Sequence, residues 1–267
     1  RVLAREADGY HGLETLFCRL ALADEVTVSR TAGDVTLEVE GDVETGPPDR
    51  NLAVRAARAI LEATRQPTGV HVRLVKRIPT QAGLGGGSSD AAATLLAVNE
   101  LLGNPVPLHE LFQLASRLGA DVPFLLSGAS LALGWGHGDR LFRLPPLPRA
   151  PVLVVVPPVG VSTADAYGWV DAARIPSRGA LALDLEAVAS WGSLARMAGN
   201  DFESAVFGRV PEIRAAFEAL ARTHPLLCRM SGSGSALFAV FRTPRERDDA
   251  ASMLGRKLGR VLPTETA

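Results

Sequence analysis

The sequence predicts an α+β protein, and three observations support that fold class. Three early segments alternate apolar with polar residues in the period-two pattern of half-buried strands. Ala- and Leu-rich stretches that follow an Asn or precede a Gly carry the composition and end signals of helices. After a proline-rich segment, helical patterns and strands occur together again, so the second half belongs to the same mixed class.

The first half is expected to open with a mostly antiparallel sheet. Its strands are predicted over residues 25–30, 35–40 and 70–76, with turn formers such as Gly33 between the first two. Asn51 is a good helix N-cap, and the stretch from 51 to 63 is predicted to be a helix packed across the sheet.

Two further helices should follow in this half. Residues 89–102 are ended by Gly103, and residues 108–118 are ended by Gly119. We interpret the prolines of 144–151 as a break in regular structure, because proline fixes φ and donates no backbone hydrogen bond.

The second half is expected to mix strands with helices. The predicted strands are 152–156, 226–230 and 236–241, and the predicted helices are 164–172, 183–189, 211–222 and 244–258. The sequence therefore predicts two domains, at residues 1–148 and 149–267.

Composition excludes several classes of protein. Hydrophobic residues make up 47% and charged residues 21% of the 267, with a formal net charge of -1, so no overall field attracts nucleic acid or an anionic membrane. No apolar run reaches about 18 residues, the length that a membrane span needs. Cys18 and Cys228 lack the spacing of a zinc or redox motif and are interpreted as reduced core residues of a cytoplasmic protein.

A glycine-rich run between a strand and a helix is the most informative segment. Four glycines in the five positions 83–87 let backbone approach a ligand, and the amides that open the next helix have no partner within it. The helix dipole and the hydroxyls of Ser88 and Ser89 favour phosphate, with water or Mg²⁺ beside it. The nucleotide is expected to contact residues Pro79, Thr80, Gln81, Ala82, Gly83, Leu84, Gly85, Gly86, Gly87, Ser88 and Ser89.

Other glycine loops fit this run less well. The P-loop requires Gly-Lys-Ser/Thr at its end, and the dinucleotide fingerprint requires glycine where Ser88 stands. A dehydrogenase is thereby disfavoured, whereas a flexible loop capped by Ser89 or Asp90 is the structural alternative.

The order Pro-x-x-x-Gly-Leu-Gly-Gly-Gly-Ser-Ser-Asp-Ala-Ala, from Pro79 to Ala92, resembles the ATP-binding motif of the GHMP kinases. The resemblance implies a two-domain fold, with an N-terminal domain like domain 2 of ribosomal protein S5 and an α+β C-terminal domain. It also implies ATP and Mg²⁺ as cofactors and a small-molecule alcohol as acceptor. No protein side chain is assigned as a metal ligand.

Asp121 follows a helix, in Gly-Ala-Asp-Val-Pro, and precedes an apolar stretch. Taken by itself, such an aspartate is more often a helix N-cap. The segment is similar to the one that carries the catalytic aspartate in one branch of the GHMP kinases, and the resemblance implies that Asp121 accepts the proton of the attacking hydroxyl.

Further motifs resemble the same branch, whose acceptor is a cytidylated polyol of isoprenoid precursor synthesis. Asp8-Gly9-Tyr10-His11 would bind cytidine, since Tyr10 can stack on a base and His11 can donate and accept hydrogen bonds. The resemblance places Thr163 near the cytidyl group, and Tyr167 where an aromatic sandwiches the base against Tyr10. By themselves these residues would be a turn and a helix cap.

Two further features match positions of the family. Ser231-Gly232-Ser233-Gly234-Ser235 resembles a glycine turn that closes on the phosphate loop, and Gly232, Ser233 and Gly234 are assigned to the substrate site; alone, the segment would be a hairpin loop. Asn51 and Lys76 match positions that line the adenine pocket, although each also suits a helix cap or a strand end.

One family element is expected outside the sequence. A strand carrying Pro-Ala-Lys-x-Asn-Leu would lie before Arg1, and its lysine would help to orient the aspartate and the substrate hydroxyl. We expect a truncated form of an active enzyme; a natural pseudokinase is the less favoured interpretation. Another GHMP kinase, acting on homoserine or mevalonate, and a non-catalytic nucleotide sensor stay open as alternatives. The protein is expected to be a monomer or a weak homodimer.

Overall fold

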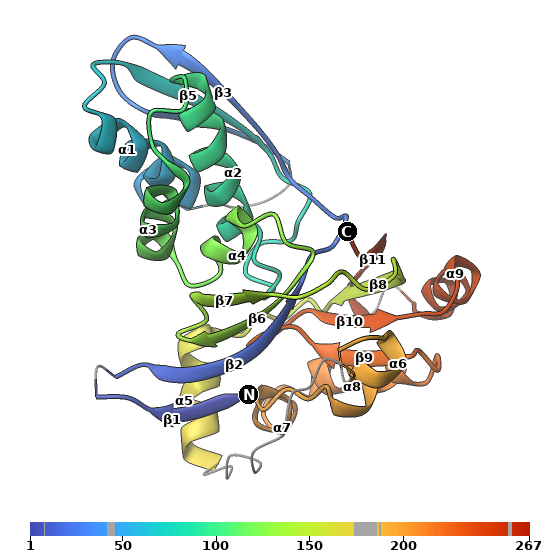
Figure 1. Ribbon diagram of the computed structural model, residues 1–267. Helices are drawn as coiled ribbons and strands as arrows, with labels where there is room; N and C mark the ends of the chain where they lie inside the picture. The colour runs from blue at the N-terminus through green and yellow to red at the C-terminus, as the bar shows by residue number, and fades with distance from the viewer. Residues whose placement is uncertain (8, 42–45, 174–185, 187, 256–257) are drawn as a thin grey trace.

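The computed structural model describes residues 1–267 except 8, 42–45, 174–185, 187 and 256–257 (Figure 1). Its strands are β1 Val2–Arg5, β2 His11–Cys18, β3 Glu25–Thr31, β4 Thr36–Glu40, β5 Gly69–Val75, β6 Leu131–Gly136, β7 Arg140–Arg143, β8 Pro151–Val156, β9 Leu227–Met230, β10 Leu237–Val240 and β11 Arg260–Glu265. Its helices are η1 Pro48–Arg50, α1 Leu52–Thr64, α2 Gly86–Leu101, α3 Leu108–Leu118, α4 Val122–Leu126, α5 Thr163–Ala173, α6 Trp191–Met197, α7 Phe202–Phe207, α8 Pro211–Ala221 and α9 Pro244–Met253. The structure therefore has the mixed α+β class that the sequence predicts.

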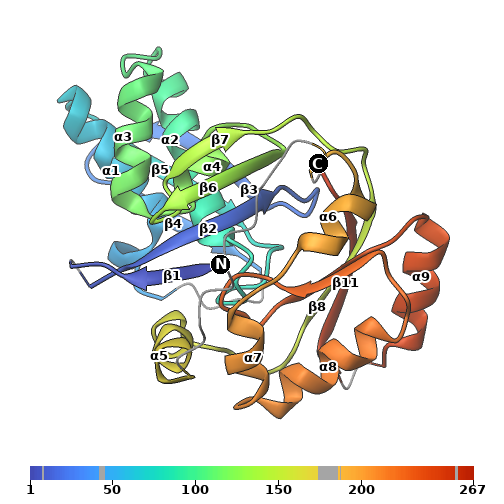
Figure 2. The same cartoon turned by 60° about the horizontal axis from the view of Figure 1, so that its bottom comes forward.

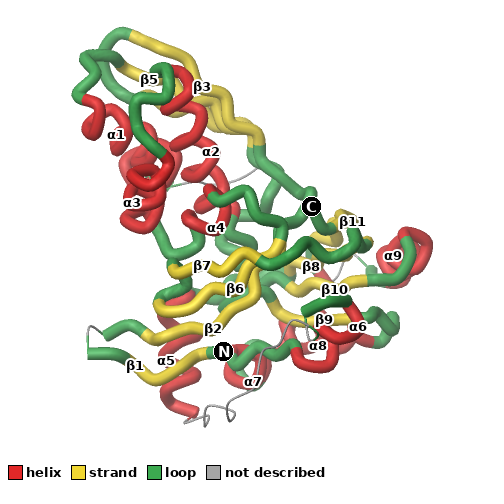
Figure 3. Tube along the Cα trace, in the orientation of Figure 1, coloured by secondary structure: helices red, strands yellow, loops and turns green. Residues whose placement is uncertain are grey.

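A three-stranded sheet with helices on one side forms one end of the molecule (Figure 3). The strand order is β3-β5-β4, and β5 is antiparallel to β3 but parallel to β4. The parallel pair corrects the expectation of a mostly antiparallel sheet here. Because α1 lies between β4 and β5 in the chain, it carries the chain back so that both strands run the same way.

The helices of this half follow their local signals closely. The Asn51 side chain accepts a hydrogen bond of 2.9 Å from the Ala53 amide, which confirms the predicted cap of α1. Helix α3 has the predicted bounds. Helix α2 begins at Gly86, three residues before the predicted start at Ser89, so it includes two of the glycines assigned to the loop.

A second sheet, of order β1-β2-β6-β7, is antiparallel throughout and was not predicted. Two of its strands have only four residues. Along β2 the burial does not alternate between buried and exposed, so the period-two pattern that identifies a half-buried strand is absent.

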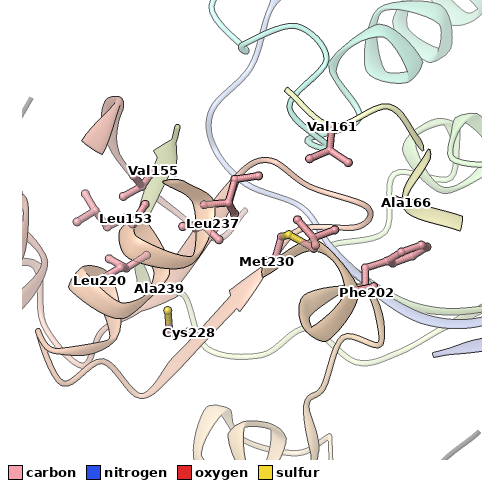
Figure 4. Close-up of a cluster of buried hydrophobic side chains, with 14 of the residues drawn as sticks. Leu153, Val155, Val161, Ala166, Phe202, Leu220, Cys228, Met230, Leu237 and Ala239 are labelled. Atoms are coloured by element: carbon pink, nitrogen blue, oxygen red, sulfur yellow. The ribbon is translucent and has the colours of Figure 1, made fainter. Parts of the chain in front are cut away.

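The third sheet, of order β11-β8-β10-β9, is the centre of the second half. Four consecutive residues of β8, Val152 to Val155, are at most 1% exposed, because both faces of the strand are covered. Leu153 and Val155 pack with α7 and α8 in the cluster of Figure 4. Val152 and Val154 face the other side, where Trp191 and Ala195 of α6 pack (Figure 2).

Predictions in the second half were confirmed for α5, α8, β8, β9 and β10, within one residue at each end. The predicted helix 183–189 falls mostly outside the described residues. The last helix ends at Met253 rather than at residue 258, and Gly255 and Gly259 separate it from β11, which was not predicted. Arg260 to Glu265 instead pair along β8.

Several contacts join the two halves. Val2 of β1 is buried in the core of the second half, and Ala82 is buried in the cluster on the other face of that sheet. Backbone bonds from Ala21 N to Glu265 O, 2.8 Å, and from Ala267 N to Arg19 O, 2.9 Å, tie the segment after β2 to the C-terminal end of the chain. The domain boundary between residues 148 and 149 stays a prediction.

No helix in the described part of the chain is long and apolar enough to cross a membrane. Cys228 is buried as expected, whereas Cys18 is exposed at the end of β2, which corrects its assignment to the core.

Candidate active site

The predicted phosphate loop joins β5 to α2. Ile78, Pro79 and Ala82 are buried and anchor it, while Thr80, Gln81, Gly83 and Gly87 are exposed. Because Gly85 is the N-cap of α2, the amides without an intrahelical partner are those of Gly86, Gly87 and Ser88. These amides, together with the helix dipole, form an anion-binding end.

A second glycine segment, residues 231–235, packs on this loop. Ser231 Oγ donates to the carbonyl of Gly83 at 2.7 Å, and the Ala236 amide donates to the carbonyl of Ala82 at 2.9 Å. Gly83 has φ +75, and a Cβ there would lie 2.6 Å from the Ser231 carbonyl oxygen and 2.8 Å from that of Gly234. Only glycine fits this approach, so the structure brings together two segments that are far apart in the sequence.

Asn200, just before α7, is hydrogen-bonded to the backbone of the glycine turn 231–235. Its Nδ2 donates to the carbonyls of Met230 and Gly232, each at 2.8 Å, and its Oδ1 accepts from the Phe202 amide at 2.9 Å. Glu203 Oε1 accepts from the Met230 amide at 2.9 Å. Sequence reasoning missed both residues; the only local signal was the polar pair Asn200-Asp201 at the start of a helix.

Asp121 stands at the start of α4, and its side chain makes no capping hydrogen bond. Asp121 therefore occupies the N-cap position that the alternative interpretation gave it, but its carboxylate does not satisfy the amides of that helix. Loss of hydration raises the pKa of the carboxyl, although the residue keeps an exposed surface. Burial, and secondly the charge of Asp121, raise the pKa of Tyr167, which places the phenol of α5 within the electrostatic reach of this carboxylate.

A group of aromatic rings includes the residues assigned to the cytidyl end of the substrate. Tyr167 stacks on His11, with ring centroids 5.0 Å apart and an interplanar angle of 20°, and it meets the edge of Phe202. Tyr10 is 67% exposed, and its ring centroid lies 5.3 Å from that of His137. The sandwich of a base between Tyr10 and Tyr167 stays a prediction.

His11 has a second partner that sequence reasoning missed. Its Nε2 lies 2.8 Å from Asp171 Oδ1 at the end of α5. A carboxylate in this position favours the proton on Nε2, which leaves Nδ1 as the acceptor of a neutral ring.

Thr163 and Ser233, both assigned to the substrate, meet in the structure. Their hydroxyl oxygens are 3.1 Å apart, which links the start of α5 to the glycine turn.

The two residues assigned to the adenine pocket have structural partners of their own. Asn51 caps α1, and the following Leu52 is 3.7 Å from the position of a Cβ on Gly87. Lys76 is 7% exposed, and its ammonium contacts Asp24 and Asp90. Their contact with a nucleotide stays a prediction. In the described residues, no group of three or more His, Cys, Asp or Glu side chains could hold a metal ion.

Comparisons with known proteins point in one direction. Residues 51–129 match the family model of the GHMP kinases N terminal domain, and residues 182–260 match that of the GHMP kinases C terminal. A 4-diphosphocytidyl-2-C-methyl-D-erythritol kinase of Solibacter usitatus is 42% identical over 96% of this chain and 81% of the relative. One of Deinococcus radiodurans is 41% identical, over 96% and 85%.

Solved structures agree. A crystal structure of 4-(cytidine 5'-diphospho)-2C-methyl-D-erythritol kinase matches with a TM-score of 0.82 and 38% identity, over 100% of this chain and 94% of the other. Mevalonate kinase of L. major matches with a TM-score of 0.68 at 13% identity, over 96% and 90%, which is a likeness of fold alone.

Proposed function

The chain belongs to the GHMP kinases, and on that premise we propose that it uses ATP to phosphorylate the 2-hydroxyl of 4-diphosphocytidyl-2-C-methyl-D-erythritol, a step in isoprenoid precursor synthesis. Relatives that carry the name of this enzyme are similar over nearly the whole chain, and the share of each relative that is covered is also high. The enzyme class is therefore a phosphotransferase with an alcohol acceptor.

One observation carries the proposal beyond the family: the contact between the two glycine segments. Ser231 and Ala236 hold the carbonyls of Gly83 and Ala82, and Thr163 joins the same turn through Ser233. A triphosphate bound at the start of α2 would therefore lie next to the glycine turn, and this turn contacts the first residue of α5. Positioning of this kind is the main means by which kinases accelerate phosphoryl transfer.

Asp121 is the proposed general base. It is exposed enough to reach an acceptor, makes no capping bond, and has a pKa raised by loss of hydration. A raised pKa makes a carboxylate a stronger proton acceptor, so it suits the removal of the proton from the attacking hydroxyl.

The residues of the loop, Pro79 to Ser89, together with Asn51 and Lys76, are the proposed ATP site. The amides of Gly86, Gly87 and Ser88 fit phosphate oxygens because no side chain is needed to satisfy them. Mg²⁺ would supply charge neutralisation to the phosphates when bound, and the hydroxyl oxygens of Ser88 and Ser89 would accept hydrogen bonds from its water shell.

Tyr10, His11, Thr163, Tyr167 and the turn 232–234 are the proposed site of the cytidylated polyol. With Nε2 of His11 held by Asp171, Nδ1 remains as an acceptor for the amino group of cytosine. A monomeric or weakly dimeric state, a cytoplasmic location and the lack of a nucleic-acid partner stay predictions of the sequence.

The decisive experiment measures ATP-dependent phosphorylation by the protein in its full natural reading frame. CDP-methylerythritol should be a substrate, while homoserine and mevalonate should not. Asp121→Asn should lower kcat by about 10² to 10⁴ and leave ATP binding largely intact. Binding of ATP without turnover of any of the three alcohols would instead support a nucleotide sensor, and preference for homoserine or mevalonate would support another member of the family.

A further inference from the structure

A network of three buried charges lies behind the phosphate loop. Lys76 directly follows β5; its Nζ donates to Asp90 Oδ2 at 2.8 Å and also to Asp24. Lys76 is 7% and Asp90 is 4% exposed. Asp24 Oδ1 further accepts the amides of Arg77 and Ile78, at 2.6 and 2.8 Å. Charges this deeply buried are retained only where each is well paired.

The network touches the first turn of α2. A Cβ on Gly86 would lie 3.5 Å from Lys76 Nζ and 2.9 Å from Ile78 Cγ2, so the ammonium is packed directly against the backbone that begins the helix. Asp90 is one turn further along the same helix. Lys76 therefore joins the end of β5 to the first two turns of α2, and the first of these turns holds the amides of Gly86, Gly87 and Ser88 that have no partner within the helix.

The two carboxylates are not equally satisfied. Desolvation acts to raise the pKa of Asp24, but the hydrogen bonds from Lys76 and from two amides outweigh it, and the pKa is lowered. The Asp90 carboxylate accepts from Lys76 through Oδ2 and receives no backbone amide as Asp24 does, and its Oδ1 is buried without a hydrogen-bond partner. Desolvation raises the pKa of Asp90 to about 7, with Lys76 opposing the shift and Asp24 adding to it.

The net charge of this network explains why nucleotide binding would change the protonation of Asp90. With both carboxylates ionised, the network carries one net negative charge behind a site for an anion. A triphosphate at the start of α2 adds negative charge one helical turn from a carboxylate that is buried from water, which favours the neutral form of Asp90. Among the described residues, Lys76 and Asp24 are the charged groups that act on Asp90, from the chain beside β5 and β3.

We propose that Asp24, Lys76 and Asp90 are positioning residues for the phosphates of ATP, and that Asp90 takes up a proton when ATP binds. Protonation of Asp90 removes the net negative charge of the network. The ammonium of Lys76 then lies beside the phosphate end of α2 with one ionised carboxylate as its partner instead of two. The inference rests on the proposed function, since it requires ATP at the start of this helix.

Proton uptake is measured by calorimetric titration of the full-length protein with Mg·ATP at pH 7.5, in two buffers of different ionisation enthalpy such as Pipes and Tris. The γ-phosphate is already ionised there, because a phosphate monoester has its second pKa near about 6. The wild type should take up part of a proton per ATP, at most about 0.8 from a group of pKa about 7. Asp90→Asn should remove that uptake, and Asp34→Asn, an exposed carboxylate in the turn before β4, should not.

Kinetics tests the positioning role. Lys76→Met should raise KM for ATP about tenfold or more while the KM of the polyol changes less than about twofold. Equal rises in both constants would mean general loosening and overturn the role. If Lys76→Met does not fold, the calorimetric titrations still test the inference. Identical binding heats of the wild type in both buffers, or an unchanged proton uptake in Asp90→Asn, would overturn it. A protein that binds no ATP would instead refute the proposed function.

Discussion

Single residues set the pH behaviour expected of the reaction. The carboxyl of Asp121 has its pKa raised above the ordinary 3.8 by loss of hydration. A base works only when deprotonated, so kcat should fall as pH drops through that raised value, above the pH where an ordinary aspartate titrates. Measurement of kcat between about pH 4 and 9 at saturating substrates reveals this acid limb.

Two variants test whether the limb belongs to Asp121. Asp121→Asn should remove it along with most of the activity. Asp165→Asn, which changes an exposed carboxylate in the first turn of α5, should keep it. A limb that survives unchanged in the residual activity of Asp121→Asn would assign it to another group.

Asp90 should also make the free energy of unfolding depend on pH. Its pKa in the folded protein is about 7, above the ordinary 3.8, so between these values the folded state holds more protons than the unfolded state. The free energy of unfolding therefore falls as pH rises through this window, and the contribution is lost above it. Urea unfolding of Asp90→Asn should lack this decline, whereas equal pH slopes in wild type and variant would contradict it.

At the scale of structural elements, the glycine turn depends on Asn200. Asn200→Ala removes two hydrogen bonds to carbonyls and one from the Phe202 amide, and at about 0.5 to 1.5 kcal/mol each the free energy of unfolding should fall by about 1.5 to 4.5 kcal/mol. Asn200→Asp should be at least as harmful despite its similar shape, because a carboxylate would face two carbonyl oxygens. Gln113→Ala, an exposed amide on α3, is the control and should change stability by less than about 0.5 kcal/mol. An Asp variant as stable as wild type would refute the assignment of these bonds.

The phosphate loop depends in the same way on Gly83. A Cβ at this position meets two carbonyl oxygens at 2.6 and 2.8 Å, so Gly83→Ala should separate the loop from the turn. We expect a loss of about 1 to 3 kcal/mol in unfolding free energy, with weaker ATP binding measured by titration. Gly160→Ala has open space around it and should be neutral in both measurements. Unchanged ATP affinity in Gly83→Ala would show that the contact does not shape the site.

At the scale of the whole molecule, the halves should unfold together. Val2 lies in the core of the second half, Ala82 packs on its sheet, and residues 19–21 bond to 265–267. Variants that keep only Trp135 in β6 or only Trp191 in α6 should therefore show the same urea midpoint. ATP at about 100 times its Kd should raise the unfolding free energy by about 2.7 kcal/mol for both probes. Separate midpoints would show two independent units.

Prediction from sequence succeeded where a signal is local. Helices α1 and α3 and strand β3 follow from caps and from side-chain periodicity within a dozen residues. It failed for β1, β2, β6 and β7, because these strands are short or do not alternate buried with exposed residues. It also failed for the direction of β4, which runs parallel to β5. Pairing depends on partners that periodicity does not identify.

The sequence by itself determined that a glycine run leads into a helix whose first amides are free, and it predicts a phosphate site there, because these properties belong to neighbouring residues. Only the tertiary structure decided which groups meet there: Ser231 on Gly83, Asn200 behind the turn, His11 on Tyr167, and Lys76 between two acids. These partners are far apart in the chain, and their meeting is set by how three sheets and their helices exclude water together, which no local pattern encodes.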